Sequence, residues 1–383
     1  MQQLSPTALP DAGRPSVRQH GPSKNHMTPQ DPSPNNDIGF LSTVGLMMTY
    51  RCQVACPHCV VEAGPHRTEE VDLAEAKDWA EQIAGYREGL VQMLSITGGE
   101  PFCAVEKLAE ISDFAANLGL VVGVVTNAHW ATNPDTAVRV LRSLPGICMI
   151  GISADPYHQS VIPFDRVVNA IGAAQSCGIL YRVLVATESE ADPEYLSFVE
   201  RLKRFTSEDT IATVITFYVG RALVKIDARR YQWTQEPDPC ACTAVGAPVI
   251  FPDGRVIACI GPLLGLRASH SLVLGNLREE PLTAILDRAE NNSVLHAIRV
   301  WGPRKLVEKL RESPIASELP RAYVRDSACD VCYKLFSNPV IAAYLERLND
   351  DPGFKRYTAY GRVYYLNDAV ALDPSYASDS RDR

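Results

Sequence analysis

Three cysteines lie close enough in the sequence to bind a single metal centre. Cys52, Cys56 and Cys59 follow a C-x3-C-x2-C spacing directly after an apolar run at 41–49 that predicts a strand. Three such thiolates can each hold one iron of a [4Fe–4S] cluster, whose fourth iron then lacks a protein ligand. An open metal position is what a catalytic metal needs. A zinc site that lacks one ligand is the alternative interpretation of the same spacing.

A glycine-rich segment follows the next predicted strand. The apolar run at 92–97 leads into Gly98-Gly99-Glu100-Pro101. Two adjacent glycines allow the backbone to approach a ligand closely, and the carboxylate of Glu100 can accept hydrogen bonds from an ammonium group. A tight turn at the start of a helix would use the same residues. Because the segment lies one strand–helix unit after the cysteine loop, we interpret it as part of the same site.

The chain up to about residue 220 alternates between strand-like and helix-like segments. Between the strand-like runs, apolar residues recur at helical spacing, as at Leu108, Ile111 and Ala115. Repeated alternation predicts a parallel sheet with helices outside it, whose active face is the carboxyl ends of the strands. The expected fold class is α/β: a partial (βα)6 TIM-like barrel followed by a small cysteine-rich α+β domain. The six apolar, partly β-branched runs are 41–49, 92–97, 120–126, 147–153, 179–186 and 211–218.

Together, the two motifs and the six βα units resemble the radical S-adenosylmethionine (radical SAM) superfamily over roughly residues 40–220. The resemblance implies that Cys52, Cys56 and Cys59 ligate a [4Fe–4S] cluster and that S-adenosylmethionine chelates its open iron. One electron from the cluster then cleaves S-adenosylmethionine to a 5′-deoxyadenosyl radical. That radical abstracts a hydrogen atom from the substrate.

The resemblance also implies residues that bind S-adenosylmethionine. Gly98, Gly99 and Glu100 match the segment that binds its methionine amino group, and His58 occupies the aromatic-type position beside the adenine. Ser153 and Asp155 match a polar pair that reaches the ribose or carboxylate, with a loop cap as the alternative role. Two further segments match family patterns. They are Thr126-Asn127-Ala128, where the family commonly has glycine third, and Gly220-Arg221-Ala222.

A second cysteine set resembles the C-terminal auxiliary-cluster extension called SPASM. Cys242, Gly254 and Cys259 match its opening, and Gly275-Asn276-Leu277 matches a later part. Because no cysteine follows Cys332, the extension resembles the shortened form called twitch. It implies one auxiliary [4Fe–4S] cluster that conducts electrons, with Cys240 as an alternative to Cys242 and a structural zinc site as the alternative centre. The implied ligands are Cys242, Cys259, Cys329 and Cys332.

Four regions are expected along the chain. Residues 1–38 are a proline-rich segment that we expect to be disordered, because they hold too little apolar surface to offset the entropy of ordering. Residues 39–235 are the radical SAM partial barrel, and 236–340 are the auxiliary-cluster domain, which opens on a hairpin predicted at 248–257. Residues 341–383 are a C-terminal helix and a loose tail. Helices are also predicted around 281–312 and 339–348.

The composition indicates which classes of partner and which compartment to expect. The 383 residues carry 37 basic and 45 acidic side chains, a net charge of 37 − 45 = −8, whereas nucleic-acid-coating proteins need the opposite sign. No apolar run reaches the roughly 18 residues of a membrane span, and no apolar signal core follows a basic start. We therefore expect a cytoplasmic protein with no nucleic-acid or membrane partner, whose 11 cysteines hold metal rather than disulfides.

The expected reaction is hydrogen abstraction followed by oxidative modification of the substrate. The substrate is either a ribosomally made precursor peptide or a small intermediate of natural-product biosynthesis. An alcohol dehydrogenase or epimerase acting on a sugar or aminocyclitol is an alternative. An electron donor such as flavodoxin or ferredoxin is the expected partner. A non-catalytic iron–sulfur electron carrier or a zinc scaffold is an alternative of another class, against which Gly98-Gly99-Glu100 argues.

Several reactive or charged residues lie outside the motifs, and we predict structural roles for most of them. We expect His129 and His158, just past strand ends, to be loop histidines rather than proton-transfer groups. Cys148, inside a predicted strand, is expected to be a small buried residue. Cys103, near the active face, has no partner at ligand spacing. An acidic run is expected to form a solvated face, and its members are Glu188, Glu190, Asp192 and Glu194.

Overall fold

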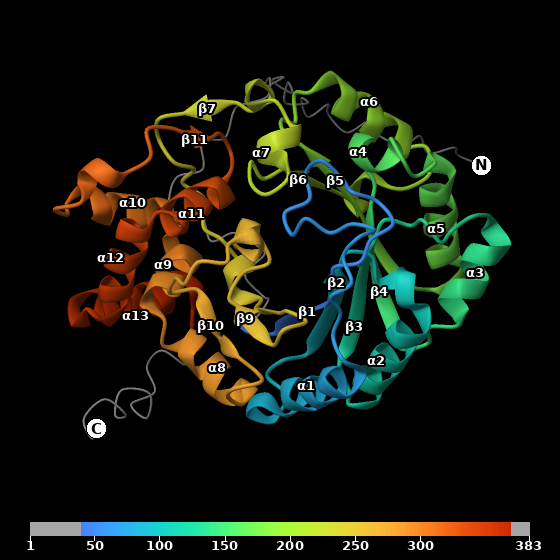
Figure 1. Ribbon diagram of the computed structural model, residues 1–383, viewed down its shortest axis with the longest axis horizontal. Coiled ribbons are helices and arrows are strands. Elements are labelled where there is room, and N and C mark those ends of the chain that lie inside the picture. Colours follow the sequence, from blue (N-terminus) through green and yellow to red (C-terminus); the bar gives the residue numbers. More distant parts are fainter. Residues whose placement is uncertain (1–39, 369–383) are drawn as a thin grey trace, which may run out of the picture. The chain divides into compact units, whose positions relative to one another are not determined.

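The computed structural model describes residues 40–368. The segment expected to be disordered at 1–38 and the loose tail at the C-terminal end lie outside this range. Six parallel strands stand in sequence order in one sheet (Figure 1), so the predicted α/β fold with six βα units is confirmed. They are β1 (Thr43–Thr49), β2 (Met93–Gly98), β3 (Val121–Thr126), β4 (Ile147–Ser153), β5 (Leu180–Thr187) and β6 (Ile211–Ile215).

Helices connect these strands and cover the outer side of the curved sheet (Figure 1). Their ends follow local sequence signals. Asp192 accepts hydrogen bonds from the backbone N–H groups of Glu194 and Tyr195 and so caps α6, and Gly178 ends α5 with a left-handed φ of 68°. The connecting helices are α1 (Leu73–Gly85), α2 (Val105–Asn117), α3 (Pro134–Arg142), α4 (Pro156–Gln159), α5 (Phe164–Cys177) and α6 (Pro193–Leu202), with short helices η1 (Tyr86–Glu88), η2 (Pro101–Ala104) and η3 (Glu208–Thr210).

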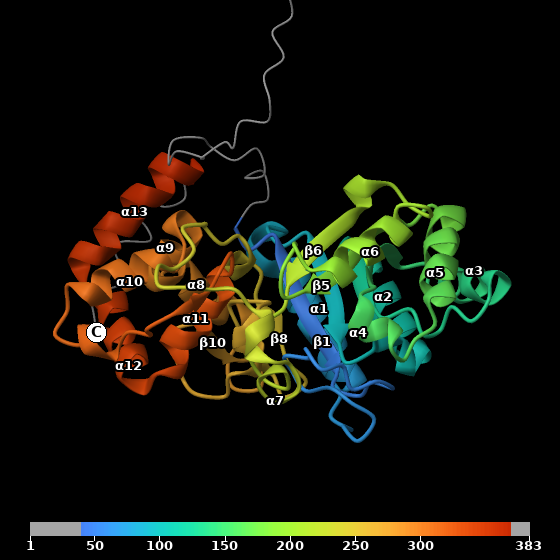
Figure 2. The same cartoon turned by 90° about the horizontal axis from the view of Figure 1, so that it is seen from above.

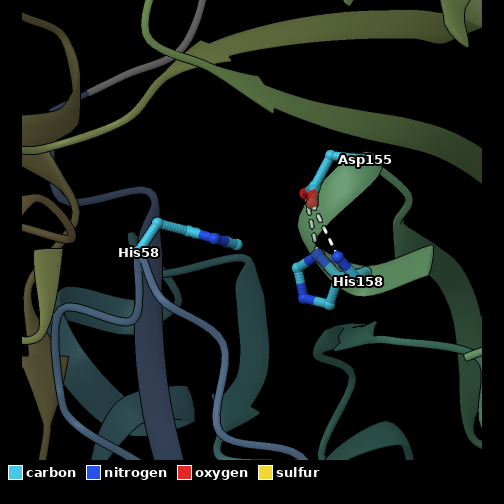
Figure 3. A group of neighbouring side chains, drawn as sticks. All are labelled: His58, Asp155 and His158. Atoms are coloured by element: carbon cyan, nitrogen blue, oxygen red, sulfur yellow. Dashed lines mark hydrogen bonds and ion pairs between the residues drawn. The ribbon is translucent and has the colours of Figure 1, made fainter. Parts of the chain in front are cut away.

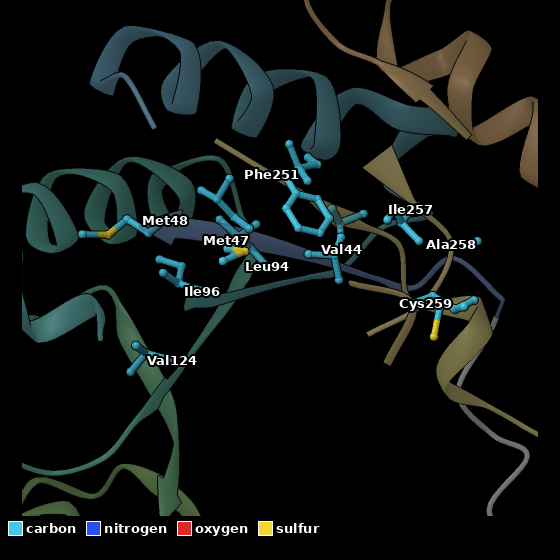
Figure 4. Close-up of a cluster of buried hydrophobic side chains, with 14 of the residues drawn as sticks. Val44, Met47, Met48, Leu94, Ile96, Val124, Phe251, Ile257, Ala258 and Cys259 are labelled. Carbon is cyan, nitrogen blue, oxygen red and sulfur yellow. The ribbon is translucent and has the colours of Figure 1, made fainter. Parts of the chain in front are cut away.

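The sheet continues on the other side of β1 with three later strands. The predicted hairpin is present, because β8 (Val249–Ile250) and β9 (Arg255–Ile257) pair antiparallel, and β10 (Val273–Asn276) follows β9. β8 lies parallel to β1, so sheet pairing bridges the boundary expected after residue 235. Figure 4 shows the consequence, since side chains from the barrel and the hairpin pack in one buried cluster, among them Val44, Leu94, Phe251 and Ile257.

The remaining elements are short or helical. The helix predicted around 281–312 is three helices, and α12 matches the prediction at 339–348, whereas the long α13 was not located by the sequence. No helix among residues 40–368 is long and apolar enough to cross a membrane. These elements are α7 (Ala222–Lys225), η4 (Ala228–Arg230), β7 (Trp233–Thr234), η5 (Ala244–Gly246), η6 (Pro262–Gly265), α8 (Leu282–Glu290), α9 (Ser293–Trp301), α10 (Arg304–Arg311), η7 (Ala316–Glu318), β11 (Tyr323–Val324), α11 (Ala328–Ser337), α12 (Pro339–Asp350) and α13 (Pro352–Leu366).

The carboxyl ends of the parallel strands lie at one edge of the sheet, as in all parallel α/β folds. Figure 2 shows the loop that follows β1 on the same side as α7, which follows β6. The loops that carry both sequence motifs therefore meet at this edge.

Candidate active site

The loop after β1 brings the three predicted cluster ligands to one cavity. Cys52 is buried, and Cys56 and Cys59 are partly buried. The backbone N–H of Cys59 donates to the carbonyl of Cys56, so the last two cysteines share a turn. The cavity is further lined by Val54, His58, Ala63, Thr97, Gly98, Gly99, Val125, Thr126, Asn127, Ser153 and His158.

Gly98 and Gly99 fit tightly against the start of the cysteine loop. A Cβ on Gly98 would lie 2.4 Å from the Thr49 carbonyl oxygen, and one on Gly99 would lie 2.2 Å from that of Arg51. The N–H of Gly99 donates to the Thr49 carbonyl at 2.6 Å. Only glycine allows this approach. The two glycines therefore hold the cysteine loop on the end of β2 while their backbone also faces the cavity.

The Glu100 carboxylate is fully buried behind the cavity wall and is occupied by protein donors. Its Oε1 accepts from the Thr126 hydroxyl at 2.7 Å and from the Phe102 N–H at 3.1 Å, and its Oε2 accepts from the Asn127 N–H at 2.7 Å. Burial raises the pKa of Glu100 to about 7, against the lowering effect of these donors. In this arrangement Glu100 positions Thr126 and Asn127, which line the cavity.

The segment after β3 has a left-handed residue at the position where the resembled family commonly has glycine. Ala128 stands where glycine is common, and its φ is 63°, in the left-handed region. An alanine there costs roughly 1–2 kcal/mol. The hydroxyl of Thr126 accepts from the Ala128 N–H at 3.1 Å and from the indole N–H of Trp130 at 3.0 Å, which fixes the turn. Asn127 thereby points its side-chain amide at the Cys52 sulfur, 3.7 Å away.

Two histidines and one aspartate, His58, Asp155 and His158, lie close to one another (Figure 3). Asp155 caps α4 by accepting from the His158 N–H at 2.9 Å, and its other oxygen pairs with Nδ1 of the His158 ring at 2.7 Å. His58, on the cysteine loop, extends toward this pair, and its ring lies 5.1 Å from that of His158. Asp155 therefore acts both as the cap considered from the sequence and as the group that orients His158.

Burial and pairing set the charges of this group. Burial lowers the pKa of His58 to about 4, so its ring is neutral at physiological pH. Burial alone would lower the pKa of His158, but the Asp155 carboxylate outweighs it and holds the pKa well above the usual value. Burial opposes ionisation of Asp155 as well, yet His158 keeps its pKa below the usual range. Nδ1 of His58 is buried with no hydrogen-bond partner among the described residues.

Arg221, from the predicted Gly220-Arg221-Ala222 segment, clamps the cysteine loop from the β6 side. Its guanidinium donates to the Cys56 carbonyl at 2.8 Å and to the Ala63 carbonyl at 2.7 Å. These carbonyls lie on either side of Cys59 in the sequence. A single planar side chain thus joins both arms of the loop.

Replacing Arg221 by alanine is expected to loosen the metal held by the loop without unfolding the protein. Removal of a group that orients metal ligands typically costs 10–100-fold in metal affinity. We expect Arg221→Ala to lose iron to a chelator roughly tenfold faster than the parent protein. The matched control is Arg229→Ala, whose side chain is 91% exposed. Equal rates of iron loss in the two variants would contradict the clamp.

The second cysteine set forms a separate pocket. Cys242, Cys259, Cys329 and Cys332, the four implied ligands, all line it together with apolar residues. Cys329 and Cys332 are three residues apart on α11, so they share one face of that helix. The N–H of Gly261 donates to the Cys259 sulfur at 3.1 Å. The apolar lining consists of Val245, Pro262, Leu263, Leu272, Ile298 and Ala328.

These four thiols are neutral without a metal. Burial raises the pKa of Cys259 to about 12, and it raises the pKa values of Cys242, Cys329 and Cys332 as well. An apolar pocket disfavours isolated thiolates, and a metal would displace their protons. The pocket therefore has the composition of a metal site rather than of a polar substrate site.

Cys242, and not Cys240, belongs to this pocket. Cys240 is exposed and its N–H bonds to Asp238, whereas Cys242 is held by a bond from its N–H to the Ile298 carbonyl. We expect Cys242→Ala to lose at least the four or so iron atoms of one [4Fe–4S] cluster, and Cys240→Ala to lose none. Iron analysis of the two purified variants distinguishes them, and the reverse pattern would contradict the assignment.

Several expectations about single residues need correction. His158 is a partly buried residue that pairs with Asp155 and lines the cavity, rather than a loop histidine. Cys148 is exposed rather than buried. Glu188 is not part of a solvated face, because its side chain is 1% exposed and accepts from the Tyr157 hydroxyl at 2.5 Å. The sequence held one signal for His158, which stands three residues after Asp155 in the polar pair at the end of β4. It held no signal that Glu188 is buried.

Comparison with known family models finds one match. Residues 46–207 match the family model described as the radical SAM superfamily. Both sequence motifs lie within the matched residues, so this part of the chain is similar to that superfamily, as the two motifs indicated.

Individual relatives are distant. The chain is similar to "Putative peptide biosynthesis protein YydG" of Bacillus subtilis (strain 168), with 19% identity over 308 residues that cover 78% of this chain and 93% of that protein. Among solved structures, BtrN in complex with AdoMet and 2-DOIA matches with a TM-score of 0.38 and 14% identity over 68% of this chain and 88% of that one. Methylornithine synthase (PylB) matches with a TM-score of 0.35 and 15% identity over 46% and 53%.

Proposed function

We propose that this protein is a radical SAM enzyme that abstracts a hydrogen atom from a peptide and leaves the peptide oxidatively modified. The observation that carries the proposal is the meeting of Cys52, Cys56 and Cys59 with the Gly98–Gly99 backbone around one cavity at the carboxyl edge of the sheet. Neither a zinc scaffold nor an electron carrier needs a glycine-walled cavity beside its cysteines.

The cavity residues fit an iron–sulfur cluster together with S-adenosylmethionine. Three thiols are the donor set of a cluster with one open iron. The unpartnered Nδ1 of His58 and the polar side chains of Asn127 and Ser153 offer hydrogen bonds to a polar cofactor. When bound, the cluster supplies one electron that cleaves S-adenosylmethionine to methionine and a 5′-deoxyadenosyl radical, which takes a hydrogen atom from the substrate.

The residues of the cavity would then divide the binding as follows. The three thiols would hold the cluster, and the Gly98–Gly99 backbone would bind the methionine amino group of S-adenosylmethionine. The neutral ring of His58 would face the adenine, and Ser153 would contact the ribose or the carboxylate. Asp155 would contribute indirectly, because it orients His158 beside Cys56.

We extend the proposal to the four-cysteine pocket as the site of one auxiliary [4Fe–4S] cluster. Four protein ligands occupy all four irons, so this cluster has no position for a substrate. Its apolar surroundings suit electron storage. A net oxidation of the substrate needs such an acceptor for the second electron.

The similarity to YydG supports a peptide substrate. YydG is described as a putative peptide biosynthesis protein, and the similarity covers 93% of it. The test is deuterium transfer. Loaded enzyme, dithionite and S-adenosylmethionine would be mixed either with an extract of small peptides from cells grown on deuterated amino acids or with deuterated sugars and aminocyclitols.

The proposal expects 5′-deoxyadenosine that is one mass unit heavier in the peptide arm alone. If labelled 5′-deoxyadenosine forms only in the sugar or aminocyclitol arm, the substrate is a small metabolite and not a peptide. Loaded enzyme that forms no 5′-deoxyadenosine in either arm would contradict the radical reaction itself.

A further inference from the structure

The turn η6 connects the two cysteine-bearing regions. It begins at Pro262, three residues after Cys259, and its residues Pro262 and Leu263 line the four-cysteine pocket. At its other end, Gly265 lies against Val60, the residue after Cys59. A Cβ on Gly265 would stand 2.7 Å from the Val60 carbonyl oxygen and 3.4 Å from its Cγ1. The wall of one pocket thus touches the loop of the other through backbone contact that leaves no room for a side chain.

Val60 is equally close to the barrel. A Cβ on Gly220 would stand 2.8 Å from the same Val60 oxygen and 3.2 Å from the Cys59 carbonyl oxygen. Arg221, the next residue, bonds to the loop carbonyls of Cys56 and Ala63. The Cys59 end of the loop therefore contacts both the segment after β6 and η6. The segment after β6 is anchored by the sheet, whereas η6 is anchored by the four-cysteine pocket.

A metal in the four-cysteine pocket would stiffen η6. Its ligands come from three segments, at Cys242, at Cys259 and on α11, and a cluster joins them through metal–sulfur bonds. Metal binding of this kind orders the segments that supply the ligands. Because Gly265 follows Cys259 by six residues and contacts Val60 directly, restriction of η6 restricts the Cys59 end of the other loop.

We propose that Gly265 is a positioning residue through which the filled four-cysteine pocket holds the cysteine loop in its metal-binding form. Filling the four-cysteine pocket then raises the iron occupancy of the Cys52–Cys56–Cys59 site. This inference rests on the proposed function, in that both cysteine sets hold iron–sulfur clusters.

The first test replaces Gly265 by alanine. Gly265 has no left-handed φ, so alanine introduces the contact with Val60 and no backbone strain. The control is Gly172→Ala in α5, where a Cβ would meet nothing within 4 Å. Reconstituted proteins would be compared by iron analysis and by the electron paramagnetic resonance signal that changes on adding S-adenosylmethionine, since only a cluster with an open iron binds it.

We expect Gly265→Ala to keep the four-cysteine cluster and to lose most of the S-adenosylmethionine-responsive signal, by several-fold relative to the parent protein and to Gly172→Ala. An undiminished signal in Gly265→Ala would overturn the inference while leaving the proposed function intact. A parent protein that takes up iron but shows no responsive signal would overturn the proposed function, and the inference with it.

The second test needs no change at Gly265 and so remains decisive if that variant folds poorly. In a chain with Cys52, Cys56 and Cys59 all replaced by alanine, iron can fill only the four-cysteine pocket. Hydrogen exchange of the loop amides is then measured with and without iron. The N–H groups of residues 59, 62 and 64 bond within the loop or to Tyr50. We expect iron to slow their exchange several-fold, and unchanged exchange would overturn the inference.

Discussion

Cys59→Ala, loaded with iron and sulfide under anaerobic conditions, is expected to hold about four iron atoms per chain where the parent holds about eight. The reason is that the two cysteine sets line separate pockets. Loss of one ligand from a three-cysteine set leaves two, too few to retain a cluster. The four-cysteine pocket keeps its own metal. Iron analysis and absorbance near 400 nm measure the loss, and the variant is expected to form no 5′-deoxyadenosine.

Two other cysteines provide matched controls. Cys148 is exposed on β4 and Cys177 ends α5, and neither lines either pocket. Cys148→Ala and Cys177→Ala should each keep about eight iron atoms. If Cys59→Ala kept all its iron, the three cysteines would not be ligands. If it lost all its iron, the four-cysteine pocket would not hold a metal of its own.

Glu100→Gln is expected to destabilise the protein and to weaken the binding of S-adenosylmethionine together. The carboxylate accepts from two backbone N–H groups, of Phe102 on one oxygen and Asn127 on the other. In either orientation, the amide of glutamine turns its NH2 group toward one of them. A buried N–H then stays unpaired, at a cost of about 1–3 kcal/mol. Chemical denaturation measures the loss.

The same variant separates two roles for Glu100. If Glu100 acts only by contacting the amino group of S-adenosylmethionine, as its motif implied, Glu100→Gln weakens binding and leaves the unfolding free energy unchanged. If it positions Thr126 and Asn127, both change. The control is Glu106→Gln, an exposed position in the first turn of α2, where we expect a change within about 0.5 kcal/mol.

The parts of the fold that depend on local sequence were predictable. All six strands of the barrel were located within a few residues, because β-branched runs alternate with helical spacing and end in recognisable caps such as Asp192. The cysteine loop and the glycine segment were located for the same reason, since each is a short motif at a strand end. The grouping of Cys242 with Cys259 was implied by the resemblance to the auxiliary-cluster extension, which left Cys240 as an alternative.

Contacts between distant segments were not predictable. Glu100 reaches residues 26 and 27 positions away, which no local pattern shows. Glu188 is buried because Tyr157 in α4 and Thr216 directly after β6 supply hydroxyl donors to its carboxylate. Cys148 is exposed although its strand is apolar, since a strand turns alternate residues to opposite faces. The contact of Gly265 with Val60 links the auxiliary-cluster domain to the barrel, which the sequence analysis predicts as two separate regions.

We propose that the cavity at the carboxyl edge of the sheet is where S-adenosylmethionine is cleaved reductively. The most direct measurement is mass spectrometry of 5′-deoxyadenosine from anaerobically loaded protein with dithionite, S-adenosylmethionine and the peptide extract, beside Cys59→Ala. The account predicts 5′-deoxyadenosine from the parent protein and none above background from Cys59→Ala. A parent protein that holds both clusters and forms none, with or without the extract, would contradict it.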